Sequence, residues 1–262
     1  MHMADLGDIR LHYRLDGPED GAPLVLIHAL GTDLRLWDAL IPLLPQGLRV
    51  LRYDLRGHGL SDIPPGPYAM GALVRDAERL MEVCGMRDAM VLGVSLGGQV
   101  TQGLAVKRHD LVRAAILSNT AARIATRQIW EDRIAQIEAQ GMAALADAVL
   151  ERWFPRAFRA TPELQRWRNM LLRTPPEGYA ACCAAIAGTD FYTPTAGLRL
   201  PVLGLAGSED GSTPPDLVRE TVDLIPGSRF ALIRGAGHLP CVDQPQAYAD
   251  HVTAFLHAQG HL

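Results

Sequence analysis

Lysine is nearly absent from this chain of 262 residues, because Lys107 is the only one and the other 24 of its 25 basic residues are arginine. The chain also lacks an excess of positive charge, since 29 acidic residues give a formal net charge of −4 at pH 7. Nucleic acids attract a strongly basic surface, so we expect no nucleic-acid partner. Arginine instead offers planar groups suited to carboxylate ligands, although most arginines in a protein simply face solvent.

Cysteine and long apolar segments are scarce as well. The four cysteines, Cys84, Cys182, Cys183 and Cys241, include no CxxC pair, so we expect neither a disulfide framework nor a zinc site. No stretch reaches the roughly 18 apolar residues of a membrane span, and the first residues do not have the pattern of a secretion signal. We therefore expect a cytoplasmic protein with no membrane partner.

The overall composition is that of a compact domain. Hydrophobic residues make up 48% of the chain and charged residues 21%, and the 25 glycines and 18 prolines are scattered, which excludes disorder, collagen and a simple coiled coil. A chain of this length can still build a single core. We expect one domain with a possible subdomain.

The order of the apolar segments predicts a doubly wound α/β sheet. Residues 8–15 alternate between apolar and polar side chains, which predicts an antiparallel edge strand. Short, mostly apolar runs without alternation follow, as is typical of strands buried on both faces of a parallel sheet: 24–27, 50–53, 90–92, 114–117 and 202–205. A later apolar run, 230–233, is a further strand candidate. Predicted helices alternate with them at 36–44, 70–84, 96–107, 214–225 and 244–257, with Thr213 as a helix N-cap.

This alternation stops between residues 121 and 195. Four helices in a row are predicted there, at 127–139, 142–154, 162–172 and 176–186. Thr161 and a capping box from Thr174 to Glu177 indicate the start of two of them. So many helical residues between two parallel strands cannot extend the sheet. We therefore expect a core formed by residues 1–120 and 196–262, with 121–195 as a helical cap over one end.

A candidate nucleophile lies at Ser95. The segment Gly93-Val94-Ser95-Leu96-Gly97 follows an apolar strand and opens a predicted helix, which is the context of a nucleophile elbow. A sharp strand-to-helix turn strains the backbone at Ser95 and leaves no room for side chains at the two glycines. The alternative is that Ser95 only caps the helix.

A serine nucleophile needs a histidine base and an acid that orients it, expected later in the chain in the order Ser, acid, His. An acid occurs in the loop 207–215 after an apolar strand, where Glu209 competes with Asp210 and we prefer Asp210. Of the three histidines in glycine-rich loops, His28, His58 and His238, only His238 follows the acid. We therefore predict that His238 is the base, the alternative being a structural loop histidine.

Backbone donors for a developing oxyanion are expected at two places. The segment His28-Ala29-Leu30-Gly31 follows the first buried strand, so the N–H groups of Leu30 and Leu96 are the candidates. The polar loop 54–61 follows the next strand, and we interpret it as fixed by internal hydrogen bonds rather than as catalytic.

Together these motifs resemble the α/β-hydrolase superfamily, and the resemblance covers nearly the whole chain. Within it the sequence is most similar to the 3-oxoadipate enol-lactonases of aromatic catabolism. The similar segments are 12–17, 30–34, 51–54, 118–124, 152–154 and 178–182.

The resemblance implies a serine hydrolase that opens a small carboxylated enol-lactone to 3-oxoadipate with no cofactor or metal. The sequence agrees, since it has no GxGxxG, P-loop or HExxH motif. The same triad also serves carboxylesterases, C–C bond hydrolases and perhydrolases, and a catalytically inactive binding module is a further alternative. The expected partner is a small-molecule substrate, for a monomer or a homo-oligomer.

The cap contains the candidate substrate-binding residues. Arginines and aromatics gather there, including Trp130, Arg133 and Trp153. Arg133 lies one helical turn from Trp130 and so shares its face, which predicts that it binds a substrate carboxylate while the indoles cover an apolar ring. The alternative is that these side chains are structural parts of the cap.

Overall fold

The computed structural model describes residues 2–262, which form an eight-stranded sheet in the order β1-β2-β4-β3-β5-β6-β7-β8. The strands are β1 His2–Asp5, β2 Arg10–Asp16, β3 Ala22–Ile27, β4 Leu48–Tyr53, β5 Ala89–Val94, β6 Val112–Ser118, β7 Val202–Gly207 and β8 Arg229–Ile233. From β4 to β8 all neighbours are parallel, whereas β1 and β2 are antiparallel. The predicted edge strand is antiparallel but not at the edge, because β1 pairs outside it.

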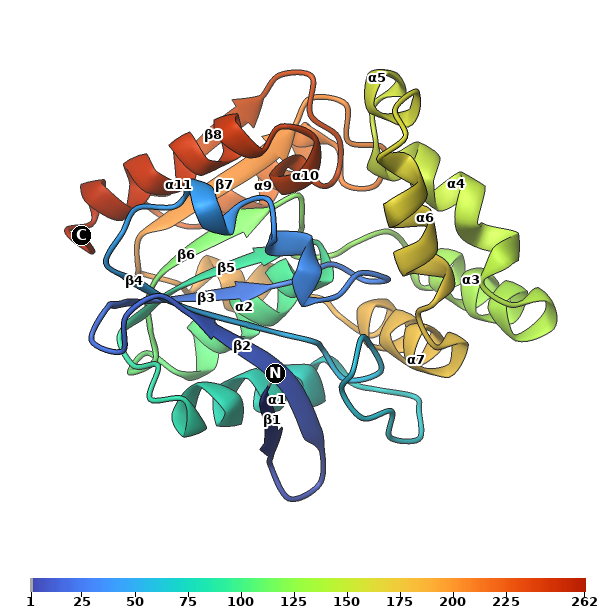
Figure 1. The fold of residues 1–262 in the computed structure, drawn as a ribbon, viewed down its shortest axis with the longest axis horizontal. Coiled ribbons are helices and arrows are strands. Elements are labelled where there is room, and N and C mark those ends of the chain that lie inside the picture. Colours follow the sequence, from blue (N-terminus) through green and yellow to red (C-terminus); the bar gives the residue numbers. More distant parts are fainter. Residues whose placement is uncertain (1) are drawn as a thin grey trace.

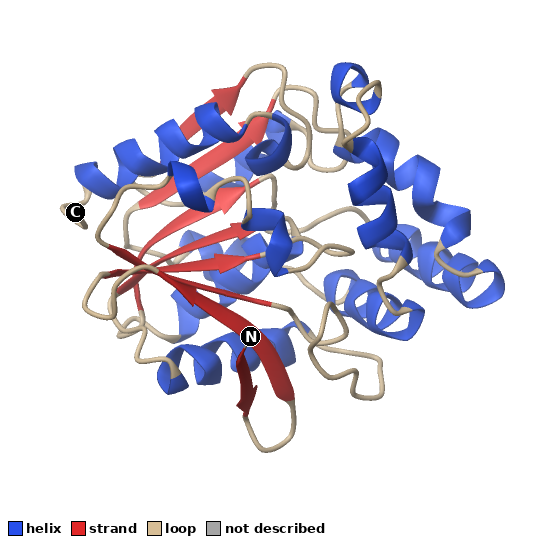
Figure 2. Ribbon diagram, in the orientation of Figure 1, coloured by secondary structure: helices blue, strands red, loops and turns tan. Residues whose placement is uncertain are grey.

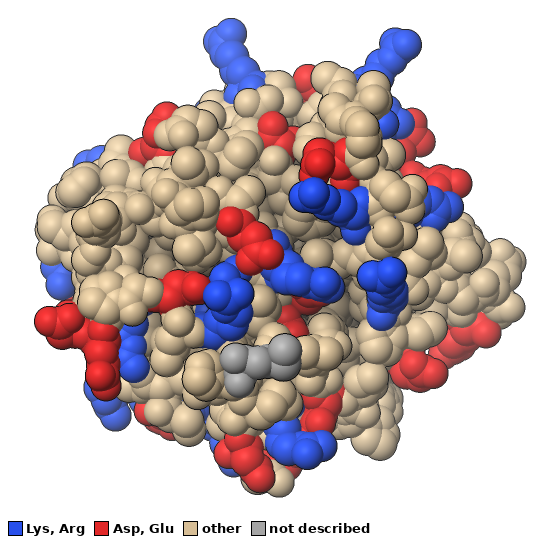
Figure 3. All heavy atoms as spheres, in the orientation of Figure 1, with Lys and Arg blue, Asp and Glu red and all other residues tan. Residues whose placement is uncertain are grey.

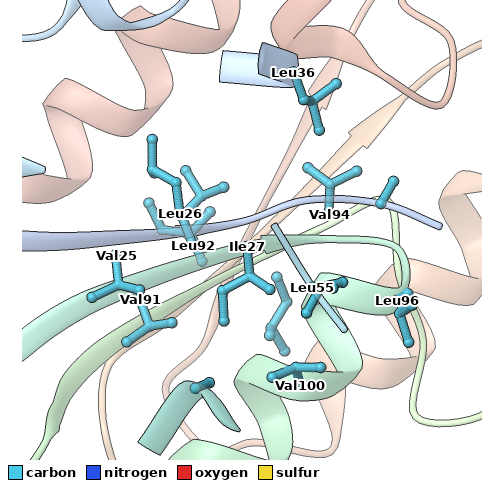
Figure 4. Packing of buried hydrophobic residues seen from close by; sticks show 14 of the residues in the cluster. Val25, Leu26, Ile27, Leu36, Leu55, Val91, Leu92, Val94, Leu96 and Val100 are labelled. Carbon is cyan, nitrogen blue, oxygen red and sulfur yellow. The ribbon is translucent and has the colours of Figure 1, made fainter. Parts of the chain in front are cut away.

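The central strands are buried on both faces, as their uniform apolar runs predict. Val25 pairs with Val91 and Leu26 with Leu92 across β3 and β5, and all four side chains are fully buried. Figure 4 shows Val25 and Val91 on one face of the sheet and Leu26 on the other. Burial of each such side chain contributes about 1.5–3 kcal/mol relative to its exposure, so these strands form a firm base for the loops at their ends.

Helices cover both faces of the sheet (Figure 2). They are α1 Met70–Val83, α2 Leu96–Lys107, α9 Pro215–Asp223, α10 Pro240–Asp243 and α11 Pro245–Ala258. The predicted helix 36–44 is wrong, because this segment forms two 3₁₀ helices, η1 Leu34–Trp37 and η2 Ile41–Leu43. Pro42 has no backbone N–H to continue an α-helix through this segment.

Six helices lie between β6 and β7 in the chain, and we call them the cap helices. They are α3 Arg127–Gln140, α4 Ala143–Trp153, α5 Arg156–Arg159, α6 Leu164–Leu172, α7 Pro176–Ala187 and α8 Tyr192–Ala196. Figure 1 shows α3, α4, α6 and α7 beyond the ends to which the strand arrows point. In a parallel sheet of this kind, ligands bind at that edge.

Two predicted helix caps within this segment are wrong, although the helix predicted from residue 176 does begin at Pro176. The helices begin at Leu164 and Pro176, and neither Thr161 nor Thr174 caps them. The Thr161 hydroxyl donates to the Phe158 carbonyl and the Thr174 hydroxyl to the Met170 carbonyl, 2.8 and 3.2 Å away. Threonine hydroxyls readily bond back to a preceding turn, so here they close the turns before the new helices.

Close backbone packing joins the cap helices to the sheet. Gly57, in the loop after β4, lies against Gly178 of α7, and a Cβ added at either glycine would overlap the backbone of the other. Only glycines allow this approach, which fixes Tyr179 beside the carboxyl ends of the strands.

Three further observations on residues 2–262 concern disulfides, membrane-spanning helices and metal sites. The four cysteines are free and buried. No helix in this range is both long and apolar enough to cross a bilayer. Nor do His, Cys, Asp and Glu side chains cluster there in a group of three or more that could hold a metal ion.

Candidate active site

Ser95 sits in a strained turn between β5 and α2. Its φ of 58° lies in the left-handed region, which a residue with a side chain rarely adopts. The turn is held by a hydrogen bond from the Ser95 N–H to the Ser118 carbonyl (3.0 Å) and one from the Thr120 hydroxyl to the Ser95 carbonyl (2.7 Å). A Cβ at Gly93 would overlap the Gly97 carbonyl, and one at Gly97 would overlap the Ile27 carbonyl. The Ser95 side chain makes no capping hydrogen bond to α2.

Asp210 and His238 are in direct contact. Asp210 follows β7, His238 follows β8, and the His238 Nδ1 lies 2.9 Å from the Asp210 Oδ2. Because a carboxylate only accepts hydrogen bonds, Nδ1 carries the proton and Nε2 is the free ring nitrogen. The competing acid Glu209 is exposed, and its backbone N–H donates to the Ala236 carbonyl. The structure therefore brings Asp210, and not Glu209, to the histidine.

Further donors surround the Asp210 carboxylate. The Asn119 amide donates to its Oδ2 at 2.9 Å and the Thr213 hydroxyl at 2.8 Å, while the Ser212 and Thr213 N–H groups donate to its Oδ1. Burial opposes ionisation, but the charge of His238 and these hydrogen bonds outweigh it and lower the pKa of Asp210. Asp210 is thus an ionised partner for the imidazole.

The role predicted for Thr213 is wrong. Pro214 occupies the N-cap position of α9, and the Thr213 hydroxyl turns to Asp210 instead. The helix α9 begins two residues after Thr213, so Thr213 does not occupy the cap position, and its hydroxyl donates to the charged Asp210 carboxylate instead of accepting from an amide of the first turn. Asn119 was also not predicted as a site residue, although its segment is one of those that resemble enol-lactonases.

Two buried histidines hold the loop that carries Leu30. The His58 Nε2 accepts a hydrogen bond from the Gly31 N–H (3.0 Å), and the His28 Nε2 accepts one from the Leu55 N–H (2.9 Å). Each Nδ1 donates to a backbone carbonyl, so both rings are neutral. Burial lowers the pKa of both imidazoles, to about 3 for His58. This network matches the interpretation of the loop 54–61 as structural.

The N–H groups of Leu30 and Leu96 have no acceptor among residues 2–262. Leu96 begins α2, where the first N–H groups of a helix are left unpaired, and Leu30 lies in the loop held by His58. Both donors are therefore available to an oxygen bound beside Ser95.

A cavity of about 140 Å³ joins most of these groups. Its walls are Leu30, Ser95, Ile124, Ala125, Ile129, Trp130, Arg133, Arg152, Trp153, Tyr179, Gly211, Ser212 and His238. They include the predicted Trp130, Arg133 and Trp153, whereas Asp210 and Leu96 are not among them. The cavity is large enough for a small ligand.

Sequence reasoning missed Arg152 and Tyr179 as wall residues. Arg152 directly precedes a predicted one, but a residue's neighbour on a helix faces another direction, so spacing alone gave no signal. Tyr179 depends on the Gly57–Gly178 contact, which no local pattern encodes. A larger cavity of about 680 Å³ includes His12, Arg14 and Arg173 but neither Ser95 nor His238.

Comparison with known proteins agrees with this geometry. The family model described as alpha/beta hydrolase fold matches residues 22–245. The chain belongs to the α/β-hydrolase family.

Relatives of this α/β hydrolase include lactonases and esterases. It is 32% identical to 3-oxoadipate enol-lactonase 2 of Acinetobacter baylyi, over 95% of this chain and 94% of that one. The crystal structure of the enol-lactonase from Burkholderia xenovorans LB400 is 36% identical, with a TM-score of 0.94 over 97% of this chain and 99% of that one. A thermophilic esterase from Thermogutta terrifontis, solved with malate bound, is 31% identical, with a TM-score of 0.90 over 98% and 96%.

Proposed function

We propose that this hydrolase opens a small carboxylated enol-lactone, 3-oxoadipate enol-lactone, to 3-oxoadipate, with Ser95, His238 and Asp210 as its catalytic triad. The observation that carries the proposal is the small cavity in which Ser95 and His238 meet a guanidinium, Arg133, that is paired with no carboxylate. Similarity to enol-lactonases along nearly the whole chain supports the same substrate.

In the proposed mechanism the Ser95 hydroxyl attacks the lactone carbonyl carbon while His238 takes its proton at Nε2. Asp210 keeps Nδ1 protonated and stabilises the imidazolium. The N–H groups of Leu30 and Leu96 donate to the tetrahedral oxyanion, and one such donor contributes about 10²–10³ in kcat.

The ring C–O bond then breaks and leaves an acyl-enzyme. The enol oxygen leaves with the electron pair and receives the proton from His238, and the enol tautomerises to a ketone. A water molecule gives a proton to His238 and attacks the acyl carbon. The bond from this carbon to the Ser95 oxygen then breaks, His238 returns the proton to that oxygen, and the new carboxylic acid releases its own proton to solvent to become a carboxylate. Overall, one water is added across the lactone bond.

Arg133 is the proposed ligand for the carboxylate that the substrate already carries. Its guanidinium lies over the Trp130 ring, 4.7 Å from the centroid, so a cation–π contact orients it. Trp130 and Trp153 add apolar wall on either side of the ligand. A charge-assisted pair in a cavity of this kind discriminates against ligands that lack the carboxylate.

Ester hydrolysis is the second candidate function. The esterase relative favours it, because it shares the fold over nearly the whole chain at 31% identity.

The test is a steady-state assay of lactone ring opening beside simple aryl esters, with wild-type protein and Ser95→Ala. We expect the lactone to give the higher kcat/KM, and Ser95→Ala to lower kcat about 10⁶-fold with an unchanged circular dichroism spectrum. Activity of the variant within tenfold of wild type would contradict a serine mechanism. Faster turnover of the aryl esters would assign the esterase function instead.

A further inference from the structure

Arg152 is a second cation in the wall of the catalytic cavity. It is the penultimate residue of α4, directly before Trp153, and it is only partly exposed. No carboxylate of residues 2–262 lies within 4.0 Å of its guanidinium, and the same is true of Arg133. The cavity therefore holds two arginines and no acid that pairs with either.

Among the arginines of residues 2–262, lack of a carboxylate partner together with partial burial is uncommon, because most of the other arginines without an ion pair, such as Arg156, Arg199 and Arg234, are exposed. Arginines elsewhere are commonly paired, such as Arg10 with Asp62, Arg79 with Asp8 and Arg108 with Asp110. Figure 3 shows several Lys and Arg groups beside Asp and Glu groups on one face of the molecule. A cation removed from water without a partner is costly, so two in one small cavity indicate a ligand that supplies the missing negative charge.

The two guanidinium groups influence the same interior. Burial, and next the positive charge of Arg133, lowers the pKa of Arg152. Burial and the Cys183 thiol raise the pKa of Tyr179, whereas the charges of both arginines act on it in the opposite direction. The arginines therefore face a shared space beside the Tyr179 hydroxyl, where they repel each other until an anion is bound.

Arg152 and Arg133 are positioned by different parts of the structure. Arg133 projects from α3 and rests on Trp130, whereas the Arg152 carbonyl accepts a hydrogen bond from the Gly211 N–H (3.1 Å) in the loop that carries Asp210. The next carbonyl, that of Trp153, accepts one from the His238 N–H (2.8 Å). Arg152 is thus fixed relative to the acid–histidine pair, and Arg133 relative to the helix α3.

We propose that Arg152 forms a second carboxylate subsite, so that the cavity binds dicarboxylates with one carboxylate on each arginine. This deepens the proposed function and rests on it, because hydrolysis of a carboxylated lactone creates a second carboxylate from the lactone carbonyl. The opened product then carries two negative charges for two cations. The free site accordingly binds its diacid product, and short diacids of similar length inhibit the enzyme.

The test measures the binding of adipate and of its monoamide, adipamate, by isothermal titration calorimetry. The two ligands match in length and differ by one charge, and neither contains an ester or lactone bond. The proteins are wild type, Arg152→Met, Arg152→Lys, Arg133→Met and a control, Arg156→Met. Arg156 is an exposed arginine of the neighbouring helix α5.

Wild type is expected to bind adipate about tenfold to a hundredfold more tightly than adipamate, the range that one charge-assisted hydrogen-bonding partner provides. Either Met variant leaves a single cation, so the preference should fall to within about threefold. Arg152→Lys keeps the charge and should retain part of the preference, which separates lost charge from lost folding. Arg156→Met should behave as wild type.

Equal binding of the two ligands by wild type overturns the inference, as does a full preference in Arg152→Met. Loss of both ligands to the same extent in Arg152→Met also overturns it, because the two arginines would then grip one carboxylate together. Because the binding assay needs no turnover, it tests the second carboxylate subsite independently of the proposed lactonase activity. A wild type that prefers the diacid but opens no lactone refutes only the proposed function, and the reverse result refutes only the second subsite.

Discussion

His58 makes the stability of this enzyme sensitive to mild acid. The ring is fully buried and its Nε2 accepts the Gly31 N–H, so it cannot take up a proton without losing that bond. Burial lowers the pKa of His58 from 6.5 to about 3 in the folded protein. In the unfolded chain the ring takes up a proton near pH 6.5, so acid favours unfolding.

The size of this effect follows from the two pKa values. The contribution of His58 to the free energy of unfolding is fully present above pH 6.5 and is lost progressively as the pH falls toward 3. Between pH 7.5 and pH 5 the loss from His58 alone is about 2 kcal/mol, and below pH 3 it reaches about 5 kcal/mol. His28 adds a loss of the same sign, because burial also lowers its pKa.

Urea unfolding of wild type and His58→Gln at pH 7.5 and pH 5 measures the contribution of His58 to the pH dependence of stability. A glutamine amide can place its carbonyl oxygen near the Nε2 position and accept the Gly31 N–H, but it does not titrate. We expect the free energy of unfolding to fall about 2 kcal/mol less in His58→Gln than in wild type over this interval. His109→Gln, at an exposed histidine, is the matched control and should follow wild type.

An equal loss of stability in wild type and His58→Gln would refute the reasoning, because it would mean that His58 is not held neutral. His58→Leu gives an independent check of the hydrogen bond. It leaves the buried Gly31 N–H without an acceptor, which should cost about 1–3 kcal/mol relative to wild type at pH 7.5. A wild-type stability in this variant would show that the bond contributes nothing.

Substitutions at Asp210 and Glu209 test which acid orients the imidazole, and a substitution at Arg56 tests a buried ion pair. Asp210→Asn should lower kcat about 10⁴-fold in the lactone assay, because the imidazole loses its ionised partner, whereas Glu209→Gln should have little effect; the opposite pattern would make Glu209 the acid. Arg56→Met should lower the free energy of unfolding by about 3–5 kcal/mol, because it leaves Asp76 buried without the bidentate pair that now joins them at 2.6 and 2.7 Å, and unchanged stability in urea unfolding would contradict this.

The parts of this protein that sequence predicts best are those in which local sterics leave few choices. Gly93 and Gly97 are required by backbone carbonyls that would overlap a side chain, so the turn at Ser95 has a recognisable pattern. The buried strands are similarly constrained, since both faces of β3 and β5 must be apolar. The loop holding Asp210 could be placed because it follows such a strand, β7, whereas the loop holding His238 follows the short apolar run of the partly exposed edge strand β8.

The parts that sequence does not predict depend on contacts between distant segments. Thr213 has the pattern of a helix cap, yet α9 begins two residues after it and the fold places its hydroxyl against the Asp210 carboxylate. The functional setting of Asn119 arises only where β6 ends beside the loops after β7 and β8. Arg152 and Tyr179 face the cavity because the end of α4 is hydrogen-bonded to the loops after β7 and β8 and because Gly178 of α7 packs against Gly57.

The attachment of α4 explains how substrate choice and catalysis can be separate in one small cavity. The carbonyls of Arg152 and Trp153 hold the Gly211 and His238 N–H groups, so the histidine is positioned by backbone atoms that a side-chain substitution leaves in place. The side chains of the same two residues form cavity wall. We therefore expect a change at Arg152 to alter anion binding without moving His238 from Asp210, whereas a change that bends the end of α4 should affect both. With the proposed roles, the helix that carries a ligand-binding arginine also holds the proposed base, which suits a fold in which one triad serves many substrates.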